Sequence, residues 1–151
     1  MSAAVEIRER RREDLDGVRG LLAGAGLPLE TLEQTRGWVA LADGELAGHV
    51  ALEQTEAGAV LRSLVVAAEA RGRGVGGTLL RRAEAEATAN TIFLRTQTIG
   101  EWVAQLGYER VALDAVPAEV RATVEFAGSI CTSVPVYRKL QTVTGEQVRR
   151  G

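Results

Sequence analysis

The stretch Glu69-Ala-Arg-Gly-Arg-Gly-Val-Gly-Gly77 decides the fold, because it places four glycines and two arginines between two apolar segments. Residues 60–68, VLRSLVVAA, are typical of a strand, and residues 78–87, TLLRRAEAEA, are typical of a helix. Glycine permits positive φ angles, so successive N–H groups can converge on one anion beside a helix N-terminus. The stretch therefore predicts a phosphate-binding turn, and the alternative is a tight strand-to-helix turn that binds nothing.

The composition predicts an ordinary globular protein with a small-molecule substrate. The chain has 151 residues, of which 46% are hydrophobic and 25% charged, with a formal net charge of −2. That charge argues against a general nucleic-acid partner, and no apolar run approaches the roughly 20 residues of a membrane span. One cysteine, Cys131, and one histidine, His49, make a disulfide or a metal site of those ligands unexpected. We therefore expect a cytoplasmic protein with no metal and with neither nucleic acid nor membrane as partner.

Hydrophobic periodicity predicts an α/β fold with a mixed sheet, in the order β-α-α-β-β-β-α-β-α-β-α-β. We expect the strands at residues 4–10, 37–42, 45–54, 59–67, 91–96, 108–113 and 132–140. The expected helices cover residues 14–26, 28–34, 74–88, 99–107 and 116–126. Residues 1–140 should form a single domain, and the polar residues 141–151 a mobile tail.

Five residues at predicted element boundaries carry specific expectations. Asp14 is expected to cap the first helix, and Pro28 to begin the second. Asp43-Gly44 is a strong hairpin signal between the second and third strands. Pro135 suggests that the last strand lies at a sheet edge or carries a bulge.

Two other phosphate-binding motifs compare poorly with the glycine stretch. A Walker loop is excluded, because no Gly-Lys-Ser/Thr follows. Gly72, Gly74 and Gly77 match G-x-G-x-x-G, the fingerprint of dinucleotide-binding folds. Such folds also require an acidic residue about 20 positions further on, which binds the ribose. Residues 93–100, FLRTQTIG, lack one, and the three expected antiparallel strands before the motif are foreign to that fold. A dinucleotide-dependent enzyme is therefore a distant third hypothesis.

Arg71 to Gly76 also match [Q/R]-x-x-G-x-[G/A], and with this motif the chain resembles the GNAT acyltransferases, which bind acetyl-CoA. Trp102, followed four positions later by Leu106-Gly107-Tyr108, is similar to the second signature of that family. The second half resembles the acetyltransferase domain of N-acetylglutamate synthases and small acetyltransferases encoded with arsenic-resistance genes. The resemblance implies a mixed, mostly antiparallel sheet flanked by helices. It also implies acetylation of the amine of a small amino acid or amino-acid-like toxin by direct attack.

The resemblance further implies where acetyl-CoA binds. Leu64, Val65 and Val66 would offer backbone groups to the pantetheine arm, and the N–H of Val65 or Val66 would stabilise the oxyanion. The pyrophosphate would lie on the glycine stretch and the residue after it, namely Arg71, Gly72, Arg73, Gly74, Val75, Gly76, Gly77 and Thr78.

The amine substrate has fewer candidate residues. Strand parity places Glu53 and Arg62 on one face, where arginine could hold a substrate carboxylate and glutamate could act as base near the amine. The alternative is a structural ion pair with water as the base. Thr96 and Gln97 either line the acetyl or substrate pocket or cap the next helix. His49 shares the face of Glu53 and could be a base or a packed wall residue, and we favour the wall residue.

One position departs from the family pattern. Val103 stands where the family often has a tyrosine that protonates the departing thiolate, and we do not rank Tyr108 and Tyr137 as substitutes. Because of this departure, the alternative function is a CoA-binding sensor or scaffold module without turnover. Small domains of this family often dimerise, so the resemblance is also compatible with a homodimer.

Overall fold

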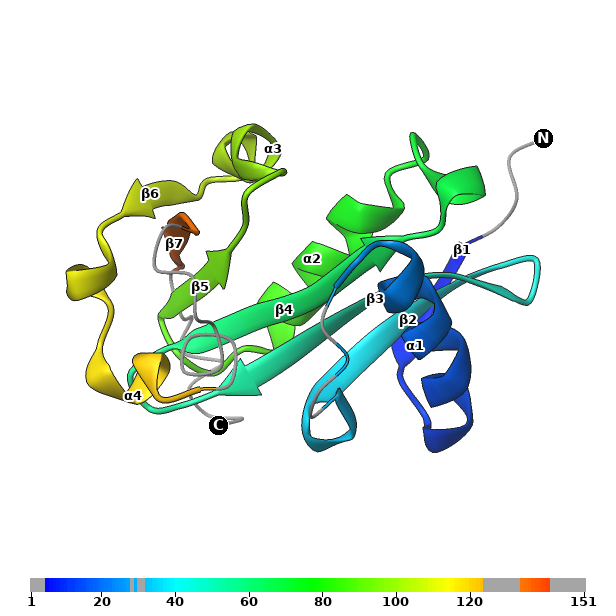
Figure 1. Ribbon diagram of the computed structural model, residues 1–151, viewed down its shortest axis with the longest axis horizontal. Helices are drawn as coiled ribbons and strands as arrows, with labels where there is room; N and C mark the ends of the chain where they lie inside the picture. Colours follow the sequence, from blue (N-terminus) through cyan, green and yellow to red (C-terminus); the bar gives the residue numbers. More distant parts are fainter. Residues whose placement is uncertain (1–4, 28, 30–31, 124–133, 142–151) are drawn as a thin grey trace. The chain divides into compact units, whose positions relative to one another are not determined.

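The structure is a computed structural model of the chain and describes residues 5–27, 29, 32–123 and 134–141 (Figure 1). The strands are β1 (Val5–Glu9), β2 (Arg36–Ala42), β3 (Glu45–Gln54), β4 (Ala59–Val66), β5 (Thr91–Arg95), β6 (Glu109–Val111) and β7 (Val136–Leu140). The α-helices are α1 (Leu15–Gly24), α2 (Val75–Glu86), α3 (Gly100–Gln105) and α4 (Ala118–Arg121). Short 3-10 turns are η1 (Arg12–Asp14), η2 (Leu32–Gln34), η3 (Ala68–Ala70) and η4 (Leu113–Ala115).

The strands form one seven-stranded sheet in the order β1-β2-β3-β4-β5-β7-β6. The pairs β1–β2, β2–β3, β5–β7 and β6–β7 are antiparallel, whereas β4 and β5 are parallel. This confirms the predicted mixed, mostly antiparallel sheet. Asp43 and Gly44 have φ angles of 53° and 80°, so they form the hairpin turn that their sequence predicts between β2 and β3.

The chain separates into two compact units, each with its own hydrophobic cluster. The first unit consists of Met1–Leu52 and Ser63–Glu86, and the second of Glu53–Arg62 and Ala87–Gly151. Strands β3 and β4 each contribute residues to both units. Within the described residues of either unit, no helix has the length and apolar character that a membrane crossing requires.

In the first unit, α1 packs its apolar face against the sheet. Val18 and Leu22 are fully buried and join Val39 of β2 and Val65 of β4 in one cluster. Their spacing of four residues places both side chains on one face of the helix. The other face of the sheet meets α2, because a Cβ atom built at Gly48 of β3 would lie 2.9 Å from a methyl carbon of Leu79. Helices thus cover both faces of this part of the sheet.

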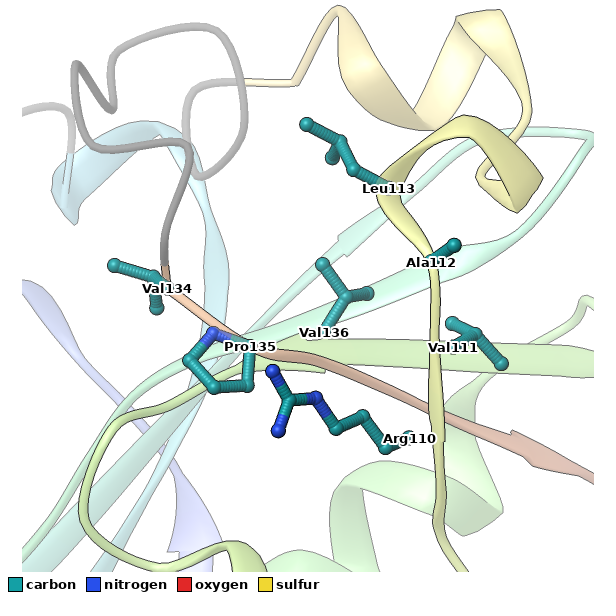
Figure 2. Close-up of a pocket in the computed structure, with 7 residues that line it drawn as sticks. All are labelled: Arg110, Val111, Ala112, Leu113, Val134, Pro135 and Val136. Atoms are coloured by element: carbon teal, nitrogen blue, oxygen red, sulfur yellow. The ribbon is translucent and has the colours of Figure 1, made fainter.

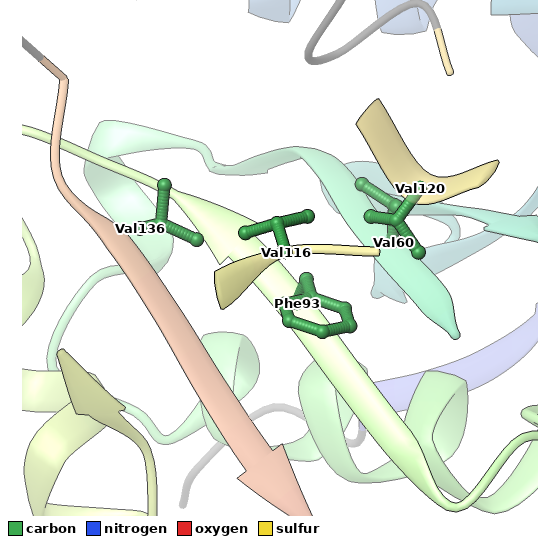
Figure 3. Packing of buried hydrophobic residues seen from close by; sticks show 5 residues of the cluster. All are labelled: Val60, Phe93, Val116, Val120 and Val136. Carbon is green, nitrogen blue, oxygen red and sulfur yellow. The ribbon is translucent and has the colours of Figure 1, made fainter. Parts of the chain in front are cut away.

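In the second unit, the cluster gathers side chains from β4, β5, β7 and the α4 region (Figure 3). Its buried members are Val60, Phe93, Val116, Val120 and Val136. Gly58 leaves room for this cluster, because a Cβ atom there would lie 2.7 Å from the Phe93 ring. The cluster fixes the turn between β3 and β4 against β5.

The prediction for Pro135 was wrong in part, because β7 lies between β5 and β6 and is not an edge strand. Pro135 immediately precedes the strand, so the sheet loses no N–H donor within β7. Its carbonyl accepts a hydrogen bond from the Thr96 N–H at 3.2 Å. The physical reason is that proline is also tolerated at the start of an internal strand.

The second predicted helix is not formed in the described residues, where only the 3-10 turn η2 follows. Pro28 and the neighbouring residues 30–31 lie outside the described residues, as do Cys131 and the predicted tail from residue 142 onward. The other predicted helices are confirmed with shorter bounds.

Asp14 occupies the predicted N-cap of α1, but its carboxylate does not cap that helix. It accepts a hydrogen bond from the Arg11 N–H at 2.7 Å and two from the Arg8 guanidinium at 2.7 and 2.9 Å. The sequence pattern could not distinguish these uses, because η1 inserts one extra turn before α1. The Arg8 hydrogen bonds are the main cause that holds the pKa of Asp14 below its ordinary value.

This pair makes a testable contribution to acid stability. A lowered folded-state pKa stabilises the protein above the unfolded pKa, and the contribution is lost as pH falls through the folded value. Asp14→Asn should therefore lower the free energy of unfolding at pH 7 by about 1 kcal/mol and flatten its decline below about pH 4. Urea unfolding from pH 7 to pH 2 would measure this, and an unchanged acid limb would contradict it.

Candidate functional site

The glycine stretch forms an exposed loop between η3 and α2. Gly72 and Gly74 have φ angles of 82° and 77°, in the left-handed region that favours glycine. A Cβ atom built at either residue would meet no atom within 4 Å. Backbone conformation, and not crowding, therefore requires these glycines, and the space beside them is open.

Helix α2 starts directly from this loop at Val75. Val75 anchors the start with 2% of its surface exposed, and Thr78 donates to the Gly74 carbonyl through its N–H at 3.1 Å and its hydroxyl at 2.9 Å. The N–H groups of Val75, Gly76 and Gly77 precede the first intrahelical bond, so helix geometry leaves them without an intrahelical acceptor. Free N–H groups, a helix dipole and open space fit a diphosphate.

Strand β4 bends just before the predicted pantetheine edge. Ser63 has a φ of 55°, which is unusual for a residue other than glycine. Beyond it, the Ala67 N–H donates to the Ala47 carbonyl at 2.8 Å, so the backbone of Ala67 faces β3. Alternation along the strand then turns the peptide groups of Val66 away from β3. Consistently, the Val66 carbonyl accepts a hydrogen bond from Arg71 Nε at 3.3 Å.

In the second unit, β4 and β5 pair in parallel, and the register joins Ala59 to Ile92 and Val60 to Phe93.

Glu53 and Arg62 are neighbours, as strand parity predicts. Arg62 Nη1 lies 3.9 Å from Glu53 Oε2, and the two side chains are 3% and 29% exposed, respectively. Glu53 Oε2 is buried, and no donor in the described part of the chain hydrogen-bonds to it. The side chains thus form a loose ion pair whose carboxylate keeps an acceptor unused. Their role in binding stays a prediction.

The two polar residues after β5 differ in what their side chains do. Thr96 Oγ1 accepts hydrogen bonds from the N–H groups of Thr98 and Ile99 at 3.1 and 3.2 Å, so it orders the turn before α3 and does not cap the helix, whose N-cap residue is Ile99. Gln97 is exposed. A contact of either residue with substrate stays a prediction.

The aromatic candidates lie close to α3. Val103 is fully buried, and Tyr108 is buried with Lys139 Nζ 5.6 Å from its ring centroid. Tyr137 is half-buried, and its hydroxyl contacts Gly100 so closely that a Cβ atom there would overlap it. Trp102 is half-buried.

Sequence reasoning missed a cavity of about 660 Å³ in the second unit. It is lined by Arg110, Val111, Ala112, Leu113, Val134, Pro135 and Val136. Figure 2 shows the Arg110 guanidinium beside Pro135 among these mostly apolar side chains. No motif marks this hollow, because it is made by the pairing of β6 with β7.

Sequence reasoning also missed the contact between Arg10 and His49. Arg10 Nη1 lies 2.9 Å from Nε2 of the fully buried His49. Strand parity could not predict this contact, because parity applies within a strand and Arg10 follows the end of β1.

Residues 33–110, more than half of the chain, match the family described as an acetyltransferase (GNAT) domain. The chain belongs to the GNAT acetyltransferase family. The match includes the glycine loop and ends in β6, so it covers both motifs that carry the resemblance. Enzymes of this family use acetyl-CoA as the acetyl donor.

Solved structures of GNAT proteins share this fold at low sequence identity. N-acetylglutamate synthase from Neisseria gonorrhoeae, solved with coenzyme A and N-acetylglutamate, is 22% identical with a TM-score of 0.80. The match covers 94% of this chain but only 36% of the synthase, so this chain spans about a third of that protein. No protein with a curated description matches.

Two smaller relatives are matched over nearly their whole length. Rv2747 from Mycobacterium tuberculosis, solved with CoA, is 20% identical with a TM-score of 0.78, over 91% of this chain and 99% of that one. Nourseothricin acetyltransferase is 19% identical with a TM-score of 0.65, over 92% of this chain and 99% of that one. At these identities the likeness shows the fold alone.

The loop geometry predicts the effect of charge at Gly74. Gly74→Asp should weaken CoA binding by at least about 100-fold, because the carboxylate would lie beside the phosphates and the left-handed backbone disfavours a side chain. Isothermal titration of the purified variant with CoA would measure this.

Gly20→Asp in α1 is the matched control, because a Cβ atom at Gly20 meets no atom within 4 Å. It adds the same charge to the same unit and should bind CoA like the wild type. A folded Gly74→Asp protein with unchanged affinity would contradict the assignment of the loop.

Proposed function

We propose that this chain is an acetyl-CoA-dependent N-acetyltransferase that acts on the amine of a small amino acid or an amino-acid-like toxin. The observation that carries the substrate class is the buried Arg62 beside Glu53, whose Oε2 is buried without a hydrogen-bond donor among the described residues. The cofactor half of the proposal lies in the first unit, and the amine half in the second.

The cofactor would be held by backbone groups more than by side chains. The N–H groups at the start of α2 would bind the diphosphate, and Arg71 and Arg73, both exposed, would add positive charge. Val66 would offer its outward peptide groups to the pantetheine arm. When bound, acetyl-CoA supplies an acetyl thioester that is reactive toward an amine.

The Arg62 guanidinium is well suited to a carboxylate. Burial of a guanidinium costs free energy that hydrogen-bonded counter-charge must offset. Arg62 Nη1 lies 3.9 Å from Glu53 Oε2, so a positive and a negative group lie side by side in the second unit. A substrate carboxylate would bind the arginine with charge-assisted hydrogen bonds, for which the planar guanidinium has the matching geometry.

Glu53 would serve the amine end of the same substrate. Its unused Oε2 can accept a hydrogen bond from an ammonium group and then hold the proton that the amine must lose before it attacks. Glu53 is 29% exposed, so a water molecule could carry that proton onward. The backbone N–H of Val65 or Val66 would stabilise negative charge on the acetyl oxygen, and Val66 is the better oriented of the two.

Several further features belong to the same proposal. We propose that residues 1–140 act as one domain in the cytoplasm, with Thr96 and Gln97 near the substrate. A homodimer and a kinship with the acetyltransferases of arsenic-resistance operons stay predictions. The synthase is named for a product of amino-acid acetylation, which supports the substrate class.

A second function is favoured by one observation. Val103 is fully buried where the family often has a tyrosine, so α3 offers no phenol at that position. A GNAT module that binds CoA as a sensor or scaffold, without turnover, would tolerate this. Thiol release from acetyl-CoA separates the two functions, because both would bind CoA.

The test is thiol release from acetyl-CoA with a panel of amines, together with CoA titration. The panel holds the amino acids, their sulfoximine, phosphinate and arsinate analogues, polyamines and aminoglycosides. Amine-dependent release with at least one α-amino acid or analogue is expected. CoA binding with no release across the panel would favour the binding module.

Arg62 gives the sharpest prediction from the amine half. Arg62→Ala should raise the KM for the amino acid at least about tenfold and leave CoA affinity unchanged, because it removes charge-assisted hydrogen bonds to the carboxylate. Steady-state kinetics at saturating acetyl-CoA would measure this.

Arg138→Ala is the matched control in the same unit. Arg138 forms an ion pair with Glu109 at 2.7 Å between β7 and β6, so its loss removes one arginine without touching Glu53 or Arg62. A stability loss in Arg62→Ala with wild-type KM would instead assign a purely structural ion pair.

A further inference from the structure

A partly buried chain of hydrogen bonds in the first unit links Arg10 to the bend of β4. Arg10 Nη1 lies 2.9 Å from His49 Nε2, and His49 Nδ1 lies 2.9 Å from the Ser63 carbonyl oxygen. An arginine N–H can only donate and a carbonyl can only accept, so Nε2 is the acceptor and Nδ1 carries the hydrogen. The imidazole of His49 is therefore neutral, and its tautomer is fixed by its two neighbours.

Arg10 is itself held in one position. Its Nη2 donates to the carbonyl oxygens of Leu32 and Thr35 at 3.0 and 2.5 Å. A Cβ atom at Gly37, in β2, would overlap Arg10 Nη1 and lie 2.9 Å from His49 Nε2. Glycine at this position thus leaves the space in which the guanidinium reaches the imidazole.

The far end of the chain is the strained residue of β4. Ser63 has a φ of 55°, a conformation that persists in a residue other than glycine only when surrounding contacts hold it. The hydrogen bond from His49 fixes the carbonyl of this residue directly. The peptide groups of Leu64 to Val66 follow at once, so the direction of the Ser63 carbonyl sets where they point.

We propose that His49 is a positioning residue, which holds the bend at Ser63 and so orients the Leu64–Val66 backbone for the pantetheine arm of acetyl-CoA. Arg10 holds His49, and Gly37 leaves room for the pair. This inference rests on the proposed function, since it assigns a purpose to the bend only if acetyl-CoA binds there. It replaces the expectation that His49 is merely a packed wall residue.

A purely structural role would give a different result from a positioning role. If His49 only filled the core, its replacement would lower stability and leave the affinity of the folded protein for CoA unchanged. If it positions the bend, CoA affinity falls even in folded protein, and a side chain that restores the bond to Ser63 restores affinity. Asparagine is that side chain, because its Nδ2 occupies nearly the place of His49 Nδ1.

The experiment compares His49→Leu and His49→Asn in the full chain, by CoA titration and by acetyl-CoA kinetics. His49→Leu should raise the Kd for CoA and the KM for acetyl-CoA about tenfold, and His49→Asn should stay within about threefold of the wild type. Val120→Ala is the control, since it removes buried volume in the other cluster and should lower Tm without changing CoA affinity.

A second variant keeps the test valid if His49→Leu does not fold. That change strips the acceptor from the guanidinium of Arg10, so Arg10→Met combined with His49→Leu removes both polar partners together. The double variant should fold and show the same tenfold loss. Wild-type affinity in either folded variant, or equal loss in His49→Asn and His49→Leu, would overturn the inference.

Amide hydrogen exchange measures how stably the bend at Ser63 is held, and it needs no cofactor. His49→Leu should accelerate exchange of the Ser63–Val66 amides at least about tenfold relative to Val18–Leu22 of α1, and His49→Asn should not. If the wild type fails to bind CoA, the proposed function fails, and this measurement alone decides whether His49 holds the bend. Unchanged exchange at Ser63–Val66 would overturn the inference.

Discussion

The left-handed backbone of Ser63 is the constraint on which the proposed cofactor edge depends. A strand with regular alternation would bond to its neighbours along its whole length and offer no peptide groups to a ligand. One residue with φ of 55° bends β4 instead, and the His49 hydrogen bond holds it. The glycines at positions 72 and 74 adopt the same left-handed region a few residues later and form the turn that leads into α2.

Much of this fold could be predicted because periodicity and glycine spacing are local signals. The bounds of β3 agree with its alternating sequence, and Asp43-Gly44 forms the predicted turn. The position of the cofactor loop follows from conformations that only glycine adopts readily. Strand parity likewise placed Arg62 beside Glu53, because the turn between their strands is short.

The errors arose where several chain segments compete for one side chain. The Asp14 carboxylate faces both the start of α1 and the Arg8 guanidinium, and the charged partner wins. The edge position expected for the strand after Pro135 was wrong, because the order of the strands in the sequence does not give their order in the sheet. Arg10 belongs to a run of charged residues, yet its side chain contacts His49. The sequence signal related to this contact is the glycine at position 37, which leaves space for it. Such contacts depend on tertiary packing, which a pattern of residue types does not contain.

The measurement that tests the account most directly is thiol release from acetyl-CoA with an amino acid and with the same amine lacking its carboxylate. The amino acid to use is the best substrate of the panel. If Arg62 binds the carboxylate and Glu53 the amine, kcat/KM should fall at least about 100-fold for the decarboxylated amine. Equal kcat/KM for the two amines would contradict the account.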